Sequence, residues 1–266
     1  MDNRAIGVFD SGLGGLTAVK ELHRLLPNED IIYLGDTGRV PYGSRSRETI
    51  IKYAQQDIDF LLTKDIKLVL AACGTVSSTL PKEISSKLPV PYADIVQPAA
   101  QQACALTSGG RIGVVGTNAT LRSNAFGKAI RSIRADVRVF GNPCPLVEAG
   151  MVQPDNQITN LTVQMYLEPL MREKIDTLIL GCTHYPLLYD IFNRLLGYQV
   201  TLIDPGRCAA GYVQRYLMQH DLLADRQREG VTEYNVTDET DSFGKTASIF
   251  LGQEVAGTVN RVELVE

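Results

Sequence analysis

Two stretches of sequence, 109 residues apart, decide the fold because they repeat one pattern. Residues 67–75 read Lys-Leu-Val-Leu-Ala-Ala-Cys-Gly-Thr, and residues 176–184 read Asp-Thr-Leu-Ile-Leu-Gly-Cys-Thr-His. Each joins a short apolar run, typical of a buried parallel strand, to a cysteine and a threonine at the point where the strand ends. The repeat predicts that two similar strands present similar chemistry.

A second pair of segments repeats at matching spacing. Ile-Gly-Val-Phe-Asp-Ser, which contains Gly7, is echoed by Ile-Gly-Val-Val-Gly-Thr, which contains Gly113; the cysteine follows that glycine by 66 residues in one copy and by 69 in the other. Chance could produce one such pair, but two pairs at matched spacing indicate two copies of one α/β unit. Ligands of open α/β sheets bind beyond the carboxyl ends of the strands, so both copies are expected to face one cleft.

Short apolar runs alternate with longer segments of helical period, which predicts parallel sheets covered by helices. Leu16, Val19, Leu22 and Leu26 form the apolar stripe of the first helix, which Pro27 ends. We therefore expect an α/β protein with two pseudo-symmetric, doubly wound parallel-sheet domains. The expected strands are 6–9, 31–34, 68–71, 112–115, 137–140, 177–180 and 199–203.

Composition excludes several classes of protein. With 266 residues, 44% of them apolar and 21% charged, the chain has the make-up of a globular protein of one or two domains. Its net charge of −4, without a block of Lys or Arg, argues against a nucleic-acid partner. No apolar run is long enough to span a membrane, and five widely spaced cysteines predict reduced thiols. We expect a cytoplasmic protein with a small-molecule substrate.

Cys73 and Cys182 each follow an expected strand and precede an expected helix start, where free N–H groups favour a thiolate. A lone cysteine is more often a small buried apolar residue, and that interpretation is kept for Cys104, Cys144 and Cys208. Two cysteines related by a pseudo-two-fold axis would approach a bound molecule from opposite sides. That arrangement suits racemisation, in which one base removes a proton and the other group returns one to the opposite face.

The turn at 10–15, Asp-Ser-Gly-Leu-Gly-Gly, lets the backbone approach a ligand closely. It lacks the ending of a phosphate loop and the glycine spacing of a dinucleotide site, although Asp36 after the next strand would suit a ribose. Asp10 is a candidate to bind an amine or to assist Cys73; a helix cap is the structural alternative.

Several further polar groups are expected at the same cleft. The loop Pro41-Tyr42-Gly43 is a candidate to present backbone N–H groups to a carboxylate, unless the tripeptide is a plain turn. Thr117 and Thr120 offer hydroxyls to the cleft or cap the next helix.

His184 is placed to tune the Cys182 thiol or to hold the substrate. A zinc site made from Cys73, Cys182 and His184 is a weaker alternative because it lacks the close ligand pairs usual for zinc. We expect no metal ion.

Five motifs together resemble those of bacterial glutamate racemases. They are Asp-Ser-Gly-Leu-Gly-Gly at 10–15, Leu-Gly-Asp at 34–36, Pro-Tyr-Gly at 41–43, Ala-Cys-Gly-Thr at 72–75 and Gly-Cys-Thr-His-Tyr-Pro-Leu-Leu at 181–188. The resemblance extends over almost the whole chain. It implies a racemase without a cofactor that interconverts L- and D-glutamate for peptidoglycan synthesis, and so for cell-wall formation and cell shape.

The same resemblance implies roles for individual residues. Cys73 would act as the base for D-glutamate and Cys182 as the base for L-glutamate. The contacts for the α-amino and α-carboxylate groups would come from Asp10, Ser11, Thr75 and Thr183, and those for the side-chain carboxylate from Tyr42 and Gly43. The auxiliary groups around the thiols would be Asp10, Asp36, Glu148 and His184.

The resemblance also implies a chain path in which the C-terminal segment returns to the first domain. The expected domains are residues 1–95 with 210–266, and residues 96–209. Members of the family are commonly dimers, so a homodimer is an expected assembly, although no interface is indicated by the sequence.

Gly74 departs from the pattern, because most of the family has Asn after the first cysteine. Glycine removes an amide that can donate and accept hydrogen bonds beside the substrate. Two alternatives therefore stay open: a racemase of the same superfamily that acts on aspartate or another acidic amino acid, and a noncatalytic carboxylate-binding homologue.

Overall fold

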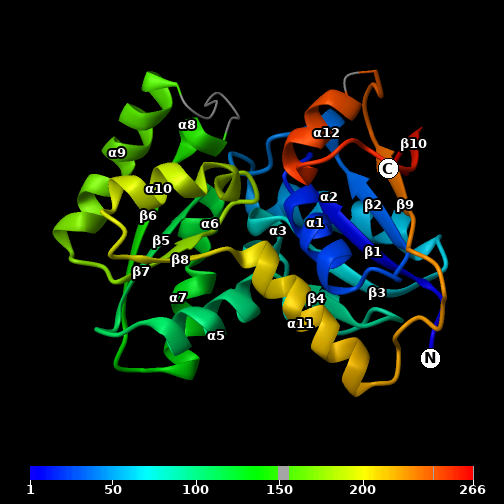
Figure 1. Cartoon of the computed structure of the whole chain (residues 1–266), viewed down its shortest axis with the longest axis horizontal. Helices are drawn as coiled ribbons and strands as arrows, with labels where there is room; N and C mark the ends of the chain where they lie inside the picture. The colour runs from blue at the N-terminus through cyan, green and yellow to red at the C-terminus, as the bar shows by residue number, and fades with distance from the viewer. Residues whose placement is uncertain (149–155, 242, 266) are drawn as a thin grey trace.

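Two wholly parallel sheets form the centres of two lobes, as the computed structural model shows for residues 1–148, 156–241 and 243–265 (Figure 1). The strand order of the first sheet is β10-β9-β2-β1-β3-β4, and that of the second is β6-β5-β7-β8. This confirms the expected pair of parallel-sheet α/β domains. Within the described ranges, no helix is both long and apolar enough to cross a membrane.

The first sheet is built mostly from the first third of the chain and is completed by its C-terminal part. Its strands are β1 (Ala5–Asp10), β2 (Ile31–Gly35), β3 (Ile66–Ala71), β4 (Tyr92–Asp94), β9 (Thr232–Val236) and β10 (Thr258–Arg261). Its helices are α1 (Leu16–Leu25), α2 (Arg47–Leu62), α3 (Gly74–Thr79), α4 (Lys82–Ser85), α11 (Pro205–Gln219) and α12 (Phe243–Leu251). A short 3₁₀ helix, η1 (Thr37–Arg39), follows β2.

The second sheet takes the middle of the chain. Its strands are β5 (Arg111–Gly116), β6 (Arg138–Pro143), β7 (Thr177–Leu180) and β8 (Thr201–Ile203). The helices around it are α5 (Val96–Leu106), α6 (Asn118–Ser123), α7 (Ala125–Ile133), α8 (Pro145–Glu148), α9 (Gln157–Arg172), η2 (Tyr185–Leu188) and α10 (Tyr189–Leu195).

Both faces of the first sheet are covered, which explains why its strands read as continuous apolar runs. Ile6, Val8 and Leu70 pack with α1, α11 and α12 on one face, whereas Phe9 and Val69 pack with α2 on the other. The second sheet is covered in the same way, by α9 and α10 on one face and by α5 and α7 on the other.

The two sheets share the arrangement that the repeated segments predict. β1 pairs with β3, with Gly7 opposite Val69, and β5 pairs with β7, with Gly113 opposite Leu178. The carboxyl end of β3 leads into Cys73, as that of β7 leads through Gly181 into Cys182. The internal repeat is therefore a structural repeat.

Some strands differ from the expectation. β6 begins at Arg138 instead of Val137 and continues to Pro143, and β8 begins at Thr201 instead of Gln199. Sequence patterning missed β4, β9 and β10 because β4 is only three residues long, while β9 and β10 contain several polar residues.

The C-terminal part of the chain returns to the first sheet, where β9 pairs with β2 and β10 pairs with β9. Figure 1 shows α11 crossing from the second lobe to the first, where it packs against α1. The expected boundary between residues 209 and 210 falls inside α11. The domain boundaries stay a prediction.

Candidate active site

The carboxyl ends of β1, β3, β5 and β7 meet at a small cavity between the lobes. Its volume is about 20 Å³, the size of a site for one water molecule. Wider hollows of about 460 and 760 Å³ lie elsewhere, but neither contains the paired cysteines. The described residues that line the small cavity are Ser11, Val40, Pro41, Tyr42, Gly43, Cys73, Gly74, Thr75, Thr117, Cys182, Thr183 and His184.

Cys73 lies at the end of β3 and caps the start of α3, as the sequence predicts. Its side chain is 3% exposed, and its thiol donates a hydrogen bond to Ser11 Oγ at 3.4 Å. Burial, followed by the charge of Asp10, raises the pKa of Cys73 to about 12. Burial therefore outweighs the helix start, contrary to the expectation of a thiolate, and Cys73 is a thiol at neutral pH.

Cys182 occupies the equivalent position after β7 and reaches the same cavity from the second lobe. Its Sγ lies 3.7 Å from His184 Nδ1. Burial lowers the pKa of His184, although the charge of Asp10 opposes this shift, so the imidazole is neutral at neutral pH. A neutral imidazole can accept the Cys182 proton, which fits the role in tuning the thiol.

Asp10 is 1% exposed at the end of β1. Its Oδ2 accepts a hydrogen bond from the Gly15 N–H at 3.0 Å, which stabilises the turn before α1, but Asp10 is not the helix cap, because that position is taken by Gly15. Its Oδ1 is buried without a hydrogen-bond partner among the described residues. Since buried carboxylate oxygens are normally satisfied, Oδ1 is a candidate acceptor for a cationic amine.

The hydroxyl groups form a bridge across the cleft. Thr75 Oγ1 of the first lobe lies 3.0 Å from Thr117 Oγ1 of the second, and Thr117 also accepts the Thr120 N–H as the cap of α6. Thr120 is buried and hydrogen-bonded to Thr117, and it is absent from the described cavity lining. Thr183 lines the cavity, and its carbonyl accepts a hydrogen bond from Thr17 at 3.4 Å.

Gly74 is the place where the two cysteine loops come closest. A Cβ at this position would lie 2.2 Å from the Gly181 carbonyl oxygen and 3.6 Å from the Cys182 Cα. That space is occupied by backbone, which cannot rotate away as a flexible side chain can. Glycine at position 74 therefore allows the main chains of the two cysteine loops to lie against each other.

Among the described sequence candidates, Asp10, Asp36 and Thr120 do not belong to the cavity lining. Asp36 is fully buried behind the Pro-Tyr-Gly loop, where it is hydrogen-bonded to Tyr42, Arg39 and Thr237. Glu148 ends α8, and its side chain lies outside the described part of the structure.

Sequence reasoning missed Asp57, which contacts Tyr42 of this loop, and Arg39, which is hydrogen-bonded to both Asp57 and Asp36. A signal for Asp57 was present, since it belongs to the buried stripe Ile50, Ala54, Asp57, Ile58 and Leu61 of α2. A carboxylate on a core-facing stripe needs a partner.

The structure also shows the surroundings of the remaining cysteines and of the possible zinc ligands. Among the residues described, no three His, Cys, Asp or Glu side chains could hold a metal ion together. Cys104 and Cys144 are buried apolar residues as expected, whereas Cys208 is half-buried and lines the hollow of about 760 Å³.

Comparison with known proteins decides the family. Residues 6–213 match the family model described as Asp/Glu/Hydantoin racemase. The chain belongs to this family. It is 41% identical over 265 residues to a glutamate racemase of Geobacter metallireducens, covering 98% of this chain and 97% of that protein.

Solved structures of glutamate racemases share the whole fold. An isoform from Bacillus anthracis has a TM-score of 0.94 at 35% identity, with 99% of both chains covered. The enzyme of Francisella tularensis, solved in complex with D-glutamate, has a TM-score of 0.88 at 36% identity, with 100% of this chain and 98% of that chain covered. An aspartate racemase of Picrophilus torridus is 16% identical and shows the fold alone. The protein therefore groups with the glutamate racemases of the family.

Proposed function

We propose that this protein interconverts L- and D-glutamate with two thiols and without a cofactor. The observation that carries the proposal is that Cys73 and Cys182 leave equivalent strands of two lobes and line one cavity. In one direction, Cys182, as the thiolate left when His184 accepts its proton, takes the α-proton of L-glutamate, and the Cys73 thiol gives its proton to the opposite face of the carbanion. The reverse reaction exchanges the roles of the two sulfurs.

The other predicted site residues bind the substrate or assist the thiols. Ser11, Thr75 and Thr183 would contact the α-amino and α-carboxylate groups, and the unpartnered Oδ1 of Asp10 would attract the ammonium. Tyr42 and Gly43 would bind the side-chain carboxylate through backbone N–H groups. His184 would exchange a proton with Cys182.

The product has a use that follows from the family. D-glutamate formed in the cytoplasm would serve peptidoglycan synthesis. We keep the homodimer as a prediction, to be tested by light scattering of the purified protein at several concentrations.

The mechanism is tested by following racemisation of each enantiomer in D₂O by circular dichroism and deuterium incorporation. Cys73→Ala and Cys182→Ala should each abolish two-way racemisation, whereas Cys208→Ala, which changes a cysteine outside the cavity, should keep it. Full two-way activity in either of the first two variants would disprove the two-thiol mechanism.

The substrate is tested in the same assay with aspartate and other acidic amino acids. Glutamate should be turned over fastest. Faster turnover of aspartate would favour the related racemase, and calorimetric binding of glutamate without racemisation would favour a noncatalytic homologue.

A further inference from the structure

The Pro41-Tyr42-Gly43 loop is anchored from behind by a buried polar network. Tyr42 is 1% exposed, and its hydroxyl contacts Asp36 Oδ2 and lies 3.0 Å from Asp57 Oδ2. The hydroxyl is thus engaged inside the first lobe. The loop can offer backbone N–H groups to the cavity, and the Gly43 carbonyl accepts the Ala119 N–H of α6 at 3.2 Å across the cleft.

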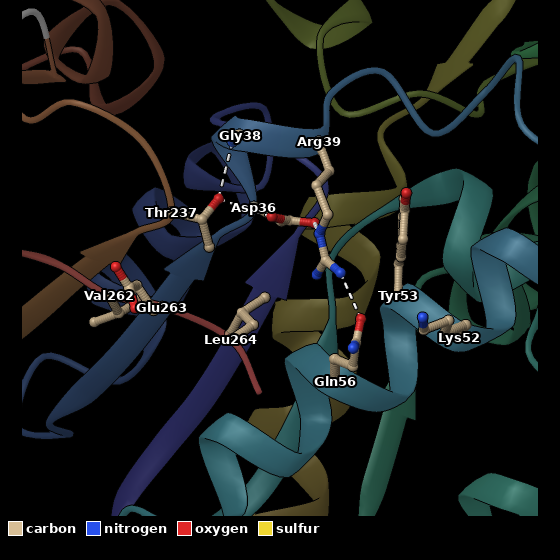
Figure 2. A pocket seen from close by; sticks show the side chains of 10 residues that line it. All are labelled: Asp36, Gly38, Arg39, Lys52, Tyr53, Gln56, Thr237, Val262, Glu263 and Leu264. Carbon is tan, nitrogen blue, oxygen red and sulfur yellow. Dashed lines mark hydrogen bonds and ion pairs between the residues drawn. The ribbon is translucent and has the colours of Figure 1, made fainter. Parts of the chain in front are cut away.

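Arg39 joins the two carboxylates of this network, and Figure 2 shows its guanidinium between Asp36 and Gln56. Its Nε donates to Asp36 Oδ2 at 2.6 Å and its Nη2 to Asp57 Oδ1 at 3.1 Å. Its Nη1 donates to Gln56 Oε1 at 2.5 Å, and its guanidinium lies 4.1 Å from the centre of the Tyr53 ring. Five donors in a planar fork suit Arg39 to hold both carboxylates at once.

A count of protons shows how the network is satisfied. Asp36 and Asp57 are both fully buried, and the Tyr42 hydroxyl has one hydrogen for two carboxylate neighbours. Burial, with the charge of Asp36 next, raises the pKa of Asp57 well above its usual range. The Tyr42 hydroxyl lies within donating distance of both carboxylates; with a proton on Asp57, it can accept from Asp57 and donate to Asp36, while Arg39 donates to both aspartates. Every contact then has one hydrogen, and the cluster is neutral.

We propose that Asp57 and Arg39 are positioning residues that anchor Tyr42 and so aim the loop N–H groups at the side-chain carboxylate of the substrate. The inference rests on the proposed function, in which this loop is the clamp for that carboxylate. Neither residue lines the catalytic cavity among the residues described, so both act through Tyr42. Arg39 also lines a separate hollow of about 460 Å³ (Figure 2). Lys52 is another residue of that lining.

The experiment compares Asp57→Ala, Asp57→Asn and Tyr42→Phe with the wild type, using KM and kcat for both enantiomers of glutamate. Removing the anchor lets the loop move, so Asp57→Ala and Tyr42→Phe should raise KM by roughly tenfold or more, with a smaller change in kcat. Asp57→Asn should retain a KM close to that of the wild type, because an amide supplies the same donor and acceptor as a protonated carboxyl.

A matched control is Asp59→Ala, which removes an exposed aspartate from the same helix. It should leave KM and kcat unchanged. Urea unfolding of every variant separates anchoring from stability, because a merely structural role would lower the unfolding midpoint without moving KM.

Two results would overturn the proposal: a folded Asp57→Ala or Tyr42→Phe variant with unchanged KM, or an Asp57→Asn variant as impaired as Asp57→Ala. Tyr42→Phe removes a single oxygen atom and keeps the test decisive if Asp57→Ala does not fold. A wild-type protein that does not racemise glutamate would instead refute the proposed function, and the two failures are therefore distinguishable.

Discussion

At the scale of single residues, Cys73 and Asp10 illustrate how burial sets the chemistry of the site. Both are almost inaccessible to solvent, and the charge of Asp10 adds to the effect of burial on Cys73. The proton that a racemase must deliver to a carbanion is thereby kept on this thiol at neutral pH.

The first prediction concerns this thiol. Asp10→Asn removes a negative charge, so the pKa of Cys73 should fall below its value of about 12, whereas Ser11→Ala removes a hydrogen bond that lowers the pKa and should raise it. The pH dependence of Cys73 alkylation by iodoacetamide, followed by peptide mass spectrometry, measures both changes. Shifts in the same direction for the two variants would contradict the assigned causes.

The second prediction concerns Gly74. Gly74→Ala and Gly74→Asn place a Cβ where the Gly181 carbonyl lies, so the cysteine loops must separate. We expect kcat/KM for glutamate to fall by about 10- to 100-fold, because small displacements of reacting groups are costly. Gly211→Ala, whose added Cβ would meet only the end of an arginine side chain, is the control and should be fully active. A more active Gly74→Asn variant would refute the close-approach argument.

At the scale of secondary-structure elements, α11 is the helix that crosses between the lobes, and the side chain of Asp204 caps its first turn. Asp204 Oδ1 accepts the N–H groups of Gly206 and Arg207 at 2.9 and 3.2 Å, and Pro205 occupies the first turn, where its missing N–H is harmless. Burial raises the pKa of Asp204, although both cap hydrogen bonds oppose this shift.

The third prediction separates the hydrogen bonds of the Asp204 cap from the negative charge of the Asp204 carboxylate. Asp204→Ala should lower the free energy of unfolding by about 1 kcal/mol. Because the pKa of Asp204 is raised on folding, its contribution favours the folded state at low pH and is lost as pH rises through the folded pKa. Asp204→Asn keeps a cap oxygen without the charge, so it should match or exceed the wild type at pH 7.

Urea unfolding at pH 4 and pH 7 measures these differences. The gain of Asp204→Asn over the wild type should be larger at pH 7 than at pH 4. If Asp204→Asn were as unstable as Asp204→Ala at pH 7, the cap would not account for the role of Asp204.

At the scale of the whole molecule, the two lobes must move apart for catalysis. The cavity has room for about one water molecule, much less than an amino acid needs. Entry of the substrate has to break contacts that cross the cleft, among them Thr75 with Thr117 and the Gly43 carbonyl with the Ala119 N–H.

The fourth prediction follows from this opening. D-glutamate should hold the lobes apart and speed hydrogen exchange of the Ala119 amide by at least about tenfold, because the bond of this amide to the Gly43 carbonyl crosses the cleft that the ligand opens. Exchange measured by NMR or by mass spectrometry of the 117–123 peptide tests this. The Leu178 amide inside β7 is the internal control, and equal exchange of Ala119 with and without D-glutamate would contradict the prediction.

Much of the fold was predictable from local sequence. The apolar runs before Cys73 and Cys182 predicted β3 and β7, since strands buried on both faces contain few polar residues. The stripe of Leu16, Val19 and Leu22 likewise predicted α1. β9 lacked such a signal, because its Thr-Glu-Tyr-Asn-Val sequence contains three polar side chains and only two apolar ones. Its place beside β2 depends on pairing with a strand about 200 residues earlier.

The sequence by itself determined that two equivalent cysteines end two equivalent strands, because the repeat carries strand, spacing and chemistry together. Only the tertiary structure decided the state of those groups. The thiol of Cys73 is protonated because residues far along the chain bury it, the Tyr42 anchor exists because Asp57 and Arg39 converge on it, and Gly74 matters because Gly181 arrives from the other lobe. Burial and long-range contact are properties of the folded chain, and spacing along the sequence does not contain them.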